Sequence, residues 1–265
     1  MTLDGKRIVY ELADPATGSI DLWTLDLTTS VTTQLTFAGP VEFYPVCSPD
    51  GMDMVFAALK PTVPNLFRQS ILAPGKATLL LATPFAKIPS HWSPDGRLLL
   101  YTAFTENMGT DIAAIPLAGG EPQILVSTPA EERNGKLSAD GRWLAYVSNE
   151  NGRSEVYVQP MPPTGSKWLV SRGGGEQPQW SANGRQLYFI AADRKLMVMP
   201  VRAAGTTLTP SVATALMDTL VTGWEAAQNG SYAVAPDGQR FLISSSTDVG
   251  RPISLLLNWT AALRP

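Results

Sequence analysis

The stretch Ser93-Pro94-Asp95-Gly96-Arg97-Leu98-Leu99-Leu100-Tyr101 decides the fold, because it joins a tight turn to a buried strand. Asp-Gly between apolar runs is the strongest short-range signal for a β-hairpin, since glycine accepts a positive φ and the aspartate side chain bonds the turn backbone. The apolar run that follows shows no alternation with polar residues, which indicates a strand buried on both faces.

The same phrase recurs along the chain as a small residue, any residue, and then Asp-Gly or Asn-Gly. The steps between successive turns are 46, 45, 45, 43 and 54 residues. A strand-rich repeat with a period in the forties is typical of a β-propeller. We therefore expect an all-β, six-bladed β-propeller of mostly four-stranded antiparallel blades, with residues 1–265 as a single domain. The turns fall at Asp4-Gly5, Asp50-Gly51, Asp95-Gly96, Asp140-Gly141, Asn183-Gly184 and Asp237-Gly238.

The third copy predicts four strands, at residues 90–93, 98–102, 111–116 and 123–126. The first copy begins at its turn, so its innermost strand is almost missing, and the last copy shows no evident fourth strand after Trp259. Two explanations stay open. Either the tail at residues 258–263 closes the seam, or Met1 is an internal start and the chain is part of a longer protein.

Composition excludes several classes of function. The net charge is −3 with a pI near 5.2, so there is no basic footprint for nucleic acid. The apolar runs are far shorter than the roughly 18 residues that a membrane span needs. The N-terminal residues Met1–Gly5 lack the basic and apolar regions of a signal peptide, and the single cysteine, Cys47, excludes an internal disulfide.

The phrase small-Pro-Asp-Gly-Lys/Arg, followed by an apolar strand, a polar loop and an aromatic-bearing strand, resembles the TolB-like, WD-like propeller repeats of bacteria. Residues 172–181 and 252–263 resemble a narrower group, in which the propeller is the C-terminal, sensory part of a Ser/Thr kinase or winged-helix regulator. The resemblance implies a bacterial protein, extracytoplasmic or cytoplasmic. The chain carries no Gly-rich kinase loop, His-Arg-Asp or Asp-Phe-Gly, so kinase activity would belong to residues outside it.

No catalytic signature accompanies the repeat. His91 is the only histidine and hence the single candidate for a catalytic base, but no Gly-x-Ser-x-Gly accompanies it, and a lone histidine is typical of a structural or channel-wall residue. We expect no metal and no cofactor. One cysteine and one histidine cannot form a zinc site, and turn aspartates about 45 residues apart do not form one calcium shell.

Two further motifs have plain structural interpretations. Gly173-Gly174-Gly175 could cradle phosphate only if a helix followed, and the residues after it indicate a strand. It is better read as a flexible loop between blades. Cys47 takes the place that Trp92 and Trp180 hold in other copies, which predicts a small buried apolar side chain.

The loops that join each outer strand to the next inner strand are more informative, because in a propeller they converge at one mouth of the central channel. Their mixture of charges and aromatics suits a small polar ligand or a peptide or protein segment, although a solvated rim is the alternative. We expect a non-enzymatic binding or sensing module. The alternatives are a hydrolase or lyase at the channel mouth and a scaffold that binds proteins on its outer edges. The candidate ligand-binding residues are Glu42, Tyr44, His91, Arg133, Lys136, Arg172, Glu176 and Trp224.

Overall fold

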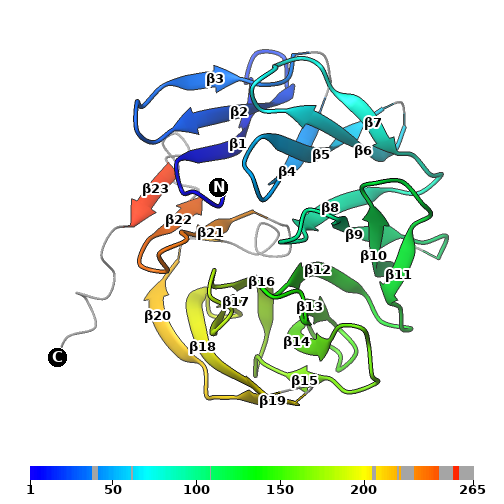
Figure 1. Ribbon diagram of the computed structural model, residues 1–265, viewed down its shortest axis with the longest axis vertical. Helices are drawn as coiled ribbons and strands as arrows, with labels where there is room; N and C mark the ends of the chain where they lie inside the picture. The colour runs from blue at the N-terminus through cyan, green and yellow to red at the C-terminus, as the bar shows by residue number, and fades with distance from the viewer. Residues whose placement is uncertain are drawn as a thin grey trace. The chain divides into compact units, whose positions relative to one another are not determined.

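The computed structural model describes residues 1–37, 41–60, 62–107, 109–204, 207–219, 221, 230–244 and 253–256. In these residues the regular structure is all β, and the sheets are antiparallel (Figure 1). No helix of the described part is long and apolar enough to cross a membrane. The chain divides into two compact units, Met1–Ile124 and Leu125–Pro265.

Unit 1 contains three sheets, each made of strands consecutive in sequence. The third-copy strands predicted at 98–102, 111–116 and 123–126 are confirmed, and the inner strand starts three residues earlier than predicted. The first sheet holds β1 (Arg7–Ala13), β2 (Ile20–Asp26) and β3 (Thr32–Gln34); the second β4 (Glu42–Cys47), β5 (Asp53–Leu59), β6 (Pro64–Ser70) and β7 (Thr78–Leu81); the third β8 (Lys87–Trp92), β9 (Leu98–Phe104), β10 (Thr110–Pro116) and β11 (Gln123–Val126), which ends just inside unit 2.

Unit 2 holds three further sheets among its described residues. The middle sheet has five strands, because the first part of the long strand β18 pairs with β20 and its last part pairs with β19. The sheets are β12 (Glu132–Leu137), β13 (Trp143–Ser148), β14 (Glu155–Pro160) and β15 (Trp168–Leu169); β16 (Gly175–Trp180), β17 (Gln186–Ala191), β18 (Lys195–Ala204), β19 (Thr207–Pro210) and β20 (Thr214–Asp218); and β21 (Tyr232–Val234), β22 (Phe241–Ser244) and β23 (Ile253–Leu256).

The expectation of four strands per sheet therefore needs correction in three places. The sheet of β16 to β20 has five strands because the 54-residue step between Asn183 and Asp237 accommodates an extra hairpin. The first sheet has three strands, and the sequence predicted that its innermost strand would be almost missing. The last sheet also has three strands in the part of the chain that is described.

The strand after the Asp-Gly turn is buried on both faces in β5, β9, β13 and β17, as its apolar run predicted. In β5, Phe56 joins a cluster with Leu22 of the first sheet, while its neighbour Val55 joins a cluster with Leu99 of the third. Both β5 side chains are fully buried. Burial of such a side chain contributes roughly 1.5–3 kcal/mol. The second sheet is thus stabilised in large part by packing against the first and the third.

The Asp-Gly turns satisfy their own hydrogen bonds. The Ser93 hydroxyl donates to Asp95 Oδ1 (2.6 Å) and accepts from the Leu98 N–H (2.8 Å), while Asp95 Oδ1 also accepts from the Arg97 N–H (3.0 Å). Gly96 has a φ of 75°, which favours glycine. These bonds lower the pKa of Asp95, beginning with the one from Ser93. The same hydroxyl-to-carboxylate or hydroxyl-to-amide contact recurs at Thr2–Asp4, Ser48–Asp50, Ser138–Asp140 and Ser181–Asn183.

Four inner strands contain a β-bulge at their opposite end. The register shifts within β4, β8, β12 and β16, at the fourth residue before the Ser of each turn or directly after it. That fourth residue has a positive φ in three sheets: Tyr44 (55°), Asn134 (59°) and Gln177 (53°). Pro89 occupies the same place in β8. We call residues 42–46, 87–91, 132–136 and 175–179 the bulged ends.

Candidate functional site

In three of the four bulged ends the first residue is charged, and its side chain is buried. Glu42, Lys87 and Glu132 occupy the same repeat position and are 2%, 1% and 0% exposed. Glu132 accepts hydrogen bonds from the N–H and hydroxyl of Thr128 and from the Ser148 hydroxyl. Each of these side chains therefore holds the loop or strand beside its own bulge.

The other two side chains use different partners. Glu42, a predicted ligand-binding residue, lies 3.6 Å from the Lys60 ammonium through Oε1. Lys87 donates to Thr83 Oγ1 (2.8 Å) and to the Phe85 carbonyl, and burial lowers its pKa to about 8. Glu42 Oε2 is also buried and has no hydrogen-bond partner, so contact between Glu42 and a ligand stays a prediction.

In unit 2 the bulged ends of β12 and β16 meet through an ion pair. Arg133 Nη2 donates to Glu176 Oε1 (2.6 Å) and to Ser154 Oγ (2.6 Å), and Arg133 Nη1 lies 3.7 Å from Glu131 Oε2. The side chains of Arg133 and Glu176 are only 17% and 16% exposed. Two predicted site residues that are 43 positions apart are thus brought into direct contact.

The environment of this pair leaves binding capacity unused. Burial raises the pKa of Glu176, and the Arg133 charge opposes that rise without cancelling it. Glu176 Oε2 and Arg133 Nε are buried and have no hydrogen-bond partner. Buried polar atoms are normally paired. One acceptor and one donor are therefore available to a ligand or a bound water.

The predicted residues of unit 1 lie at two separate bulges. The Tyr44 N–H donates to Glu11 Oε1 (2.8 Å), and the Tyr44 ring meets Phe43 edge-on with centroids 4.9 Å apart. Burial, followed by the charge of Glu11, raises the pKa of Tyr44 to about 12. His91 is half-buried directly after the bulge of β8 and pairs with Leu100 of β9.

The remaining predicted residues differ widely in exposure. Lys136 is 9% exposed, and burial lowers its pKa to about 8. Its backbone carbonyl accepts from Trp180 Nε1 (3.0 Å), which ties β12 to β16. Arg172 is exposed on the loop before β16. Trp224 lies outside the described residues, so its place in the site stays a prediction.

Two further residues contribute that are not among the candidate ligand-binding residues. Ser154 belongs to the connection between β13 and β14, and no local motif marks it. The topology could have indicated it, because this connection lies at the same end of the sheet as the start of the inner strand β12. Gln177 is 1% exposed and exchanges hydrogen bonds with the side chain and backbone N–H of Ser231. Tyr232 also donates to the Gln177 carbonyl (2.8 Å), so Gln177 joins β16 to β21.

The glycine run before β16 is held in place and is not a free loop. The Gly173 N–H donates to Glu155 Oε1 (3.0 Å), and the Ser171 hydroxyl donates to Glu155 Oε2. A Cβ on Gly175 would lie 2.6 Å from the Ser171 side chain. The expectation of a flexible loop therefore needs correction, because the run encloses an internal carboxylate.

Two pockets lie at the Asp-Gly ends of the sheets. One is in unit 1, between the first two sheets. The other is in unit 2 and is lined by the turns at Asp140 and Asn183. No group of three His, Cys, Asp or Glu side chains suited to holding a metal occurs within the described residues. The predicted mouth draws on both units, and as a whole it stays a prediction.

Comparison with solved structures identifies the class of fold. TolB from Acinetobacter baumannii matches with a TM-score of 0.75 at 18% identity, over 97% of this chain and 62% of TolB. An oligogalacturonate lyase in complex with manganese matches with a TM-score of 0.60 at 14% identity, over 97% of this chain and 87% of the lyase. A puromycin-hydrolyzing peptidase of Mycobacterium tuberculosis matches with a TM-score of 0.65 at 20% identity, over 98% of this chain and 45% of the peptidase.

The chain thus has the fold of an antiparallel, TolB-like β-propeller. It spans 62% of the length of the Acinetobacter TolB chain. No protein-family model and no curated protein matches it. Because the identities are low, these likenesses define the fold, and function has to be argued from the site.

Proposed function

We propose that the chain is a non-enzymatic binding or sensing module, built as a six-bladed propeller and forming the C-terminal part of a larger bacterial signalling protein. Its ligand is a small polar molecule or a peptide or protein segment, bound at the bulged ends of the inner strands. The TolB likeness supports this proposal at the level of fold. So does the repeated bulge, which gives four inner strands, β4, β8, β12 and β16, a similar irregular end.

The observation that carries the proposal is the pair of Arg133 and Glu176. The two side chains lie on neighbouring inner strands, are mostly buried, and keep one donor and one acceptor unpaired. A ligand that offers both an acceptor and a donor would satisfy both atoms at once. An amide, a zwitterionic amino acid or a peptide backbone has this chemistry.

The test is a thermal-shift screen with amino acids, short peptides and small hydroxy acids. Hits are then measured again on Arg133→Ala and Arg172→Ala, with Arg97→Ala as the control because Arg97 is 84% exposed in a turn. We expect Arg133→Ala to lose most of the shift and the control to keep it. Full shifts in both the Arg133 and Arg172 variants would contradict the proposal.

The second candidate is a hydrolase or lyase that works at the same mouth. Among the neighbours are a lyase and a peptidase, although the chain spans less than half of the peptidase. The observation in its favour is Lys136, whose pKa of about 8 leaves a part of the amine unprotonated near neutral pH. Turnover of any hit, lost in Lys136→Met or His91→Gln and kept in Arg97→Ala, would favour this candidate over the binding module.

A further inference from the structure

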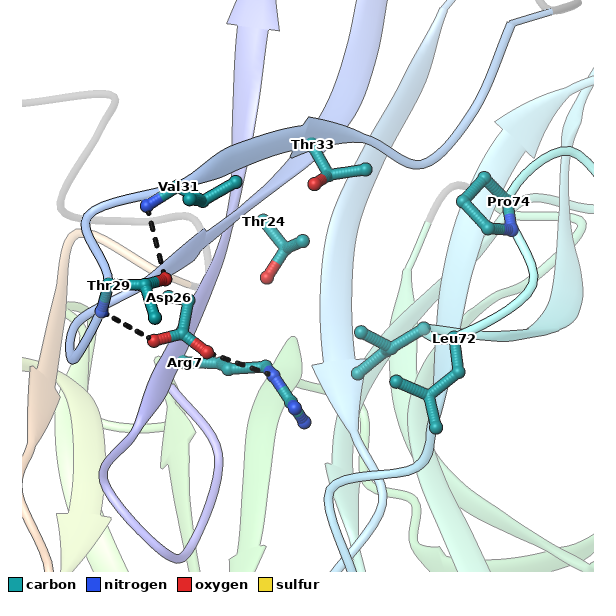
Figure 2. A pocket seen from close by; sticks show the side chains of 9 residues that line it. Arg7, Thr24, Asp26, Thr29, Val31, Thr33, Leu72 and Pro74 are labelled. Atoms are coloured by element: carbon teal, nitrogen blue, oxygen red, sulfur yellow. Dashed lines mark hydrogen bonds and ion pairs between the residues drawn. The ribbon is translucent and has the colours of Figure 1, made fainter.

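The pocket in unit 1 has a volume of about 370 Å³ and lies between the first two sheets, away from the bulged ends (Figure 2). Arg7, Thr24 and Asp26 line it from the first sheet, and the connection after β6 lines it from the second. Figure 2 shows the Arg7 guanidinium extending from the first sheet toward Leu72. Pockets of this size accept small ligands or one or two residues of a peptide.

The Asp26 carboxylate accepts hydrogen bonds from residues of its own hairpin. Its Oδ1 accepts from the Thr28 N–H (2.9 Å), the Thr28 hydroxyl and the Thr29 N–H (3.0 Å). These bonds, led by the one from the Thr28 hydroxyl, lower the pKa of Asp26 to about 2. Its Oδ2 lies 3.8 Å from Arg7 Nε. The carboxylate therefore stays ionised, and the hairpin donors offset much of its charge.

A hydrogen-bond donor of this pocket remains unused. The ion pair between Arg7 and Asp26 is long, with 3.8 Å between Nε and Oδ2, so this contact is not a hydrogen bond. Thr24 is 8% exposed, and its buried hydroxyl, which faces the pocket, has no partner. An unpaired buried hydroxyl beside a guanidinium favours a ligand that brings acceptor oxygens.

The far wall is apolar. Ile71, Leu72 and Pro74 form it, and Leu72 is 56% exposed. Val31, at the rim on the first sheet, is 57% exposed, and Phe37 beyond it is 60% exposed. Exposed apolar side chains that rim a polar pocket are typical of an interaction site.

We propose that this pocket binds a carboxylate carried on a small aliphatic group, namely the C-terminal end of a peptide that ends in Val, Leu or Ile. The Nη groups of Arg7 bind the carboxylate as a planar fork, and the Thr24 hydroxyl donates to it. The aliphatic side chain packs against Leu72 and Pro74, and the preceding residues cross the apolar rim. This site is separate from the proposed mouth and takes a different ligand.

Fluorescence anisotropy with a labelled peptide of sequence Gly-Ser-Gly-Leu-Val tests the proposal. We expect the peptide with a free C-terminus to bind at least tenfold more tightly than its C-terminal amide. Arg7→Gln should weaken binding by a similar factor, because it removes a charge-assisted bond. Arg97→Gln is the matched control, since Arg97 also follows an Asp-Gly turn but is 84% exposed and lines neither pocket.

Thr24→Val gives an independent readout. It should weaken binding several-fold while leaving the melting temperature unchanged or higher, because the hydroxyl makes no bond in the free protein. Equal affinity for the acid and the amide, or an unchanged affinity in Arg7→Gln and Thr24→Val, would overturn the proposal. Displacement of the peptide by isovalerate at the same concentration would keep the carboxylate site but reassign it to small acids.

Discussion

The two ends of the inner strands follow opposite rules. At the Asp-Gly end the same contact between a hydroxyl and a carboxylate or amide oxygen recurs in five of the six copies, and the turn satisfies itself. At the bulged end the backbone irregularity repeats, but the side chains change from sheet to sheet. The turn residues are thus nearly the same in each copy, whereas the side chains at the bulged ends differ. Ligand specificity can therefore be set at the bulged ends.

The variation at the bulged ends is itself instructive. Three sheets begin there with a buried charged residue, and the fourth begins with Gly175. The missing side chain makes room for Ser171, whose hydroxyl donates to Glu155 and accepts from the Val156 N–H (2.8 Å). The loop before β16 is therefore held by Glu155 of β14. In the sheets of β8 and β12, the loop before the inner strand is held by a residue of that strand itself, Lys87 or Glu132.

The largest effect is expected from Gly175→Ala. The new Cβ would lie 2.6 Å from the Ser171 side chain, which cannot move without breaking its bonds to Glu155 and Val156. We expect a loss of about 3 kcal/mol in the free energy of unfolding, measured by urea denaturation. Gly173→Ala is the control, because no atom lies within 4 Å and only the strain at its φ of 90° remains. Equal losses in the two variants would show that the enclosure of Glu155 is not what matters.

A smaller, pH-dependent effect is expected from Lys136→Met. Because burial lowers the pKa of Lys136 to about 8, the folded protein releases this proton at lower pH than the unfolded chain does. Lys136 therefore makes the wild type gain stability as the pH rises above 8, and lose it as the pH falls through 8. Between pH 7 and pH 9.5 the stability of wild type relative to the variant should rise by about 2 kcal/mol. Parallel stability curves would mean that the ammonium is not buried.

The smallest effect is expected at the turns. Gly96→Ala meets no atom within 4 Å, so its cost is the strain at a φ of 75°, about 1 kcal/mol. Gly109→Ala is the control in the same unit, since its φ is not positive. An unchanged melting temperature for Gly96→Ala would contradict the turn geometry that defines the repeat.

The sequence could predict the Asp-Gly ends because their chemistry is local. Ser, Asp and Gly within four residues carry all the information, and the period places the sheets. For the bulged ends, the sequence predicted candidate residues but not the contacts between them. The positive φ of Gln177 and its bonds to Ser231, 54 residues away, leave no local pattern. The contact between Arg133 and Glu176 likewise depends on the packing of two neighbouring sheets.

We propose that the ligand binds at the bulged ends of the inner strands and not at the Asp-Gly turns. Hydrogen–deuterium exchange tests it in one measurement, using the strongest hit of the thermal-shift screen whose shift survives in Arg7→Gln, so that the pocket of the first sheet is not involved. We expect slower exchange at residues 132–136 and 175–179 and unchanged exchange at the turns of residues 138–142 and 181–185. Protection confined to the turns would contradict it.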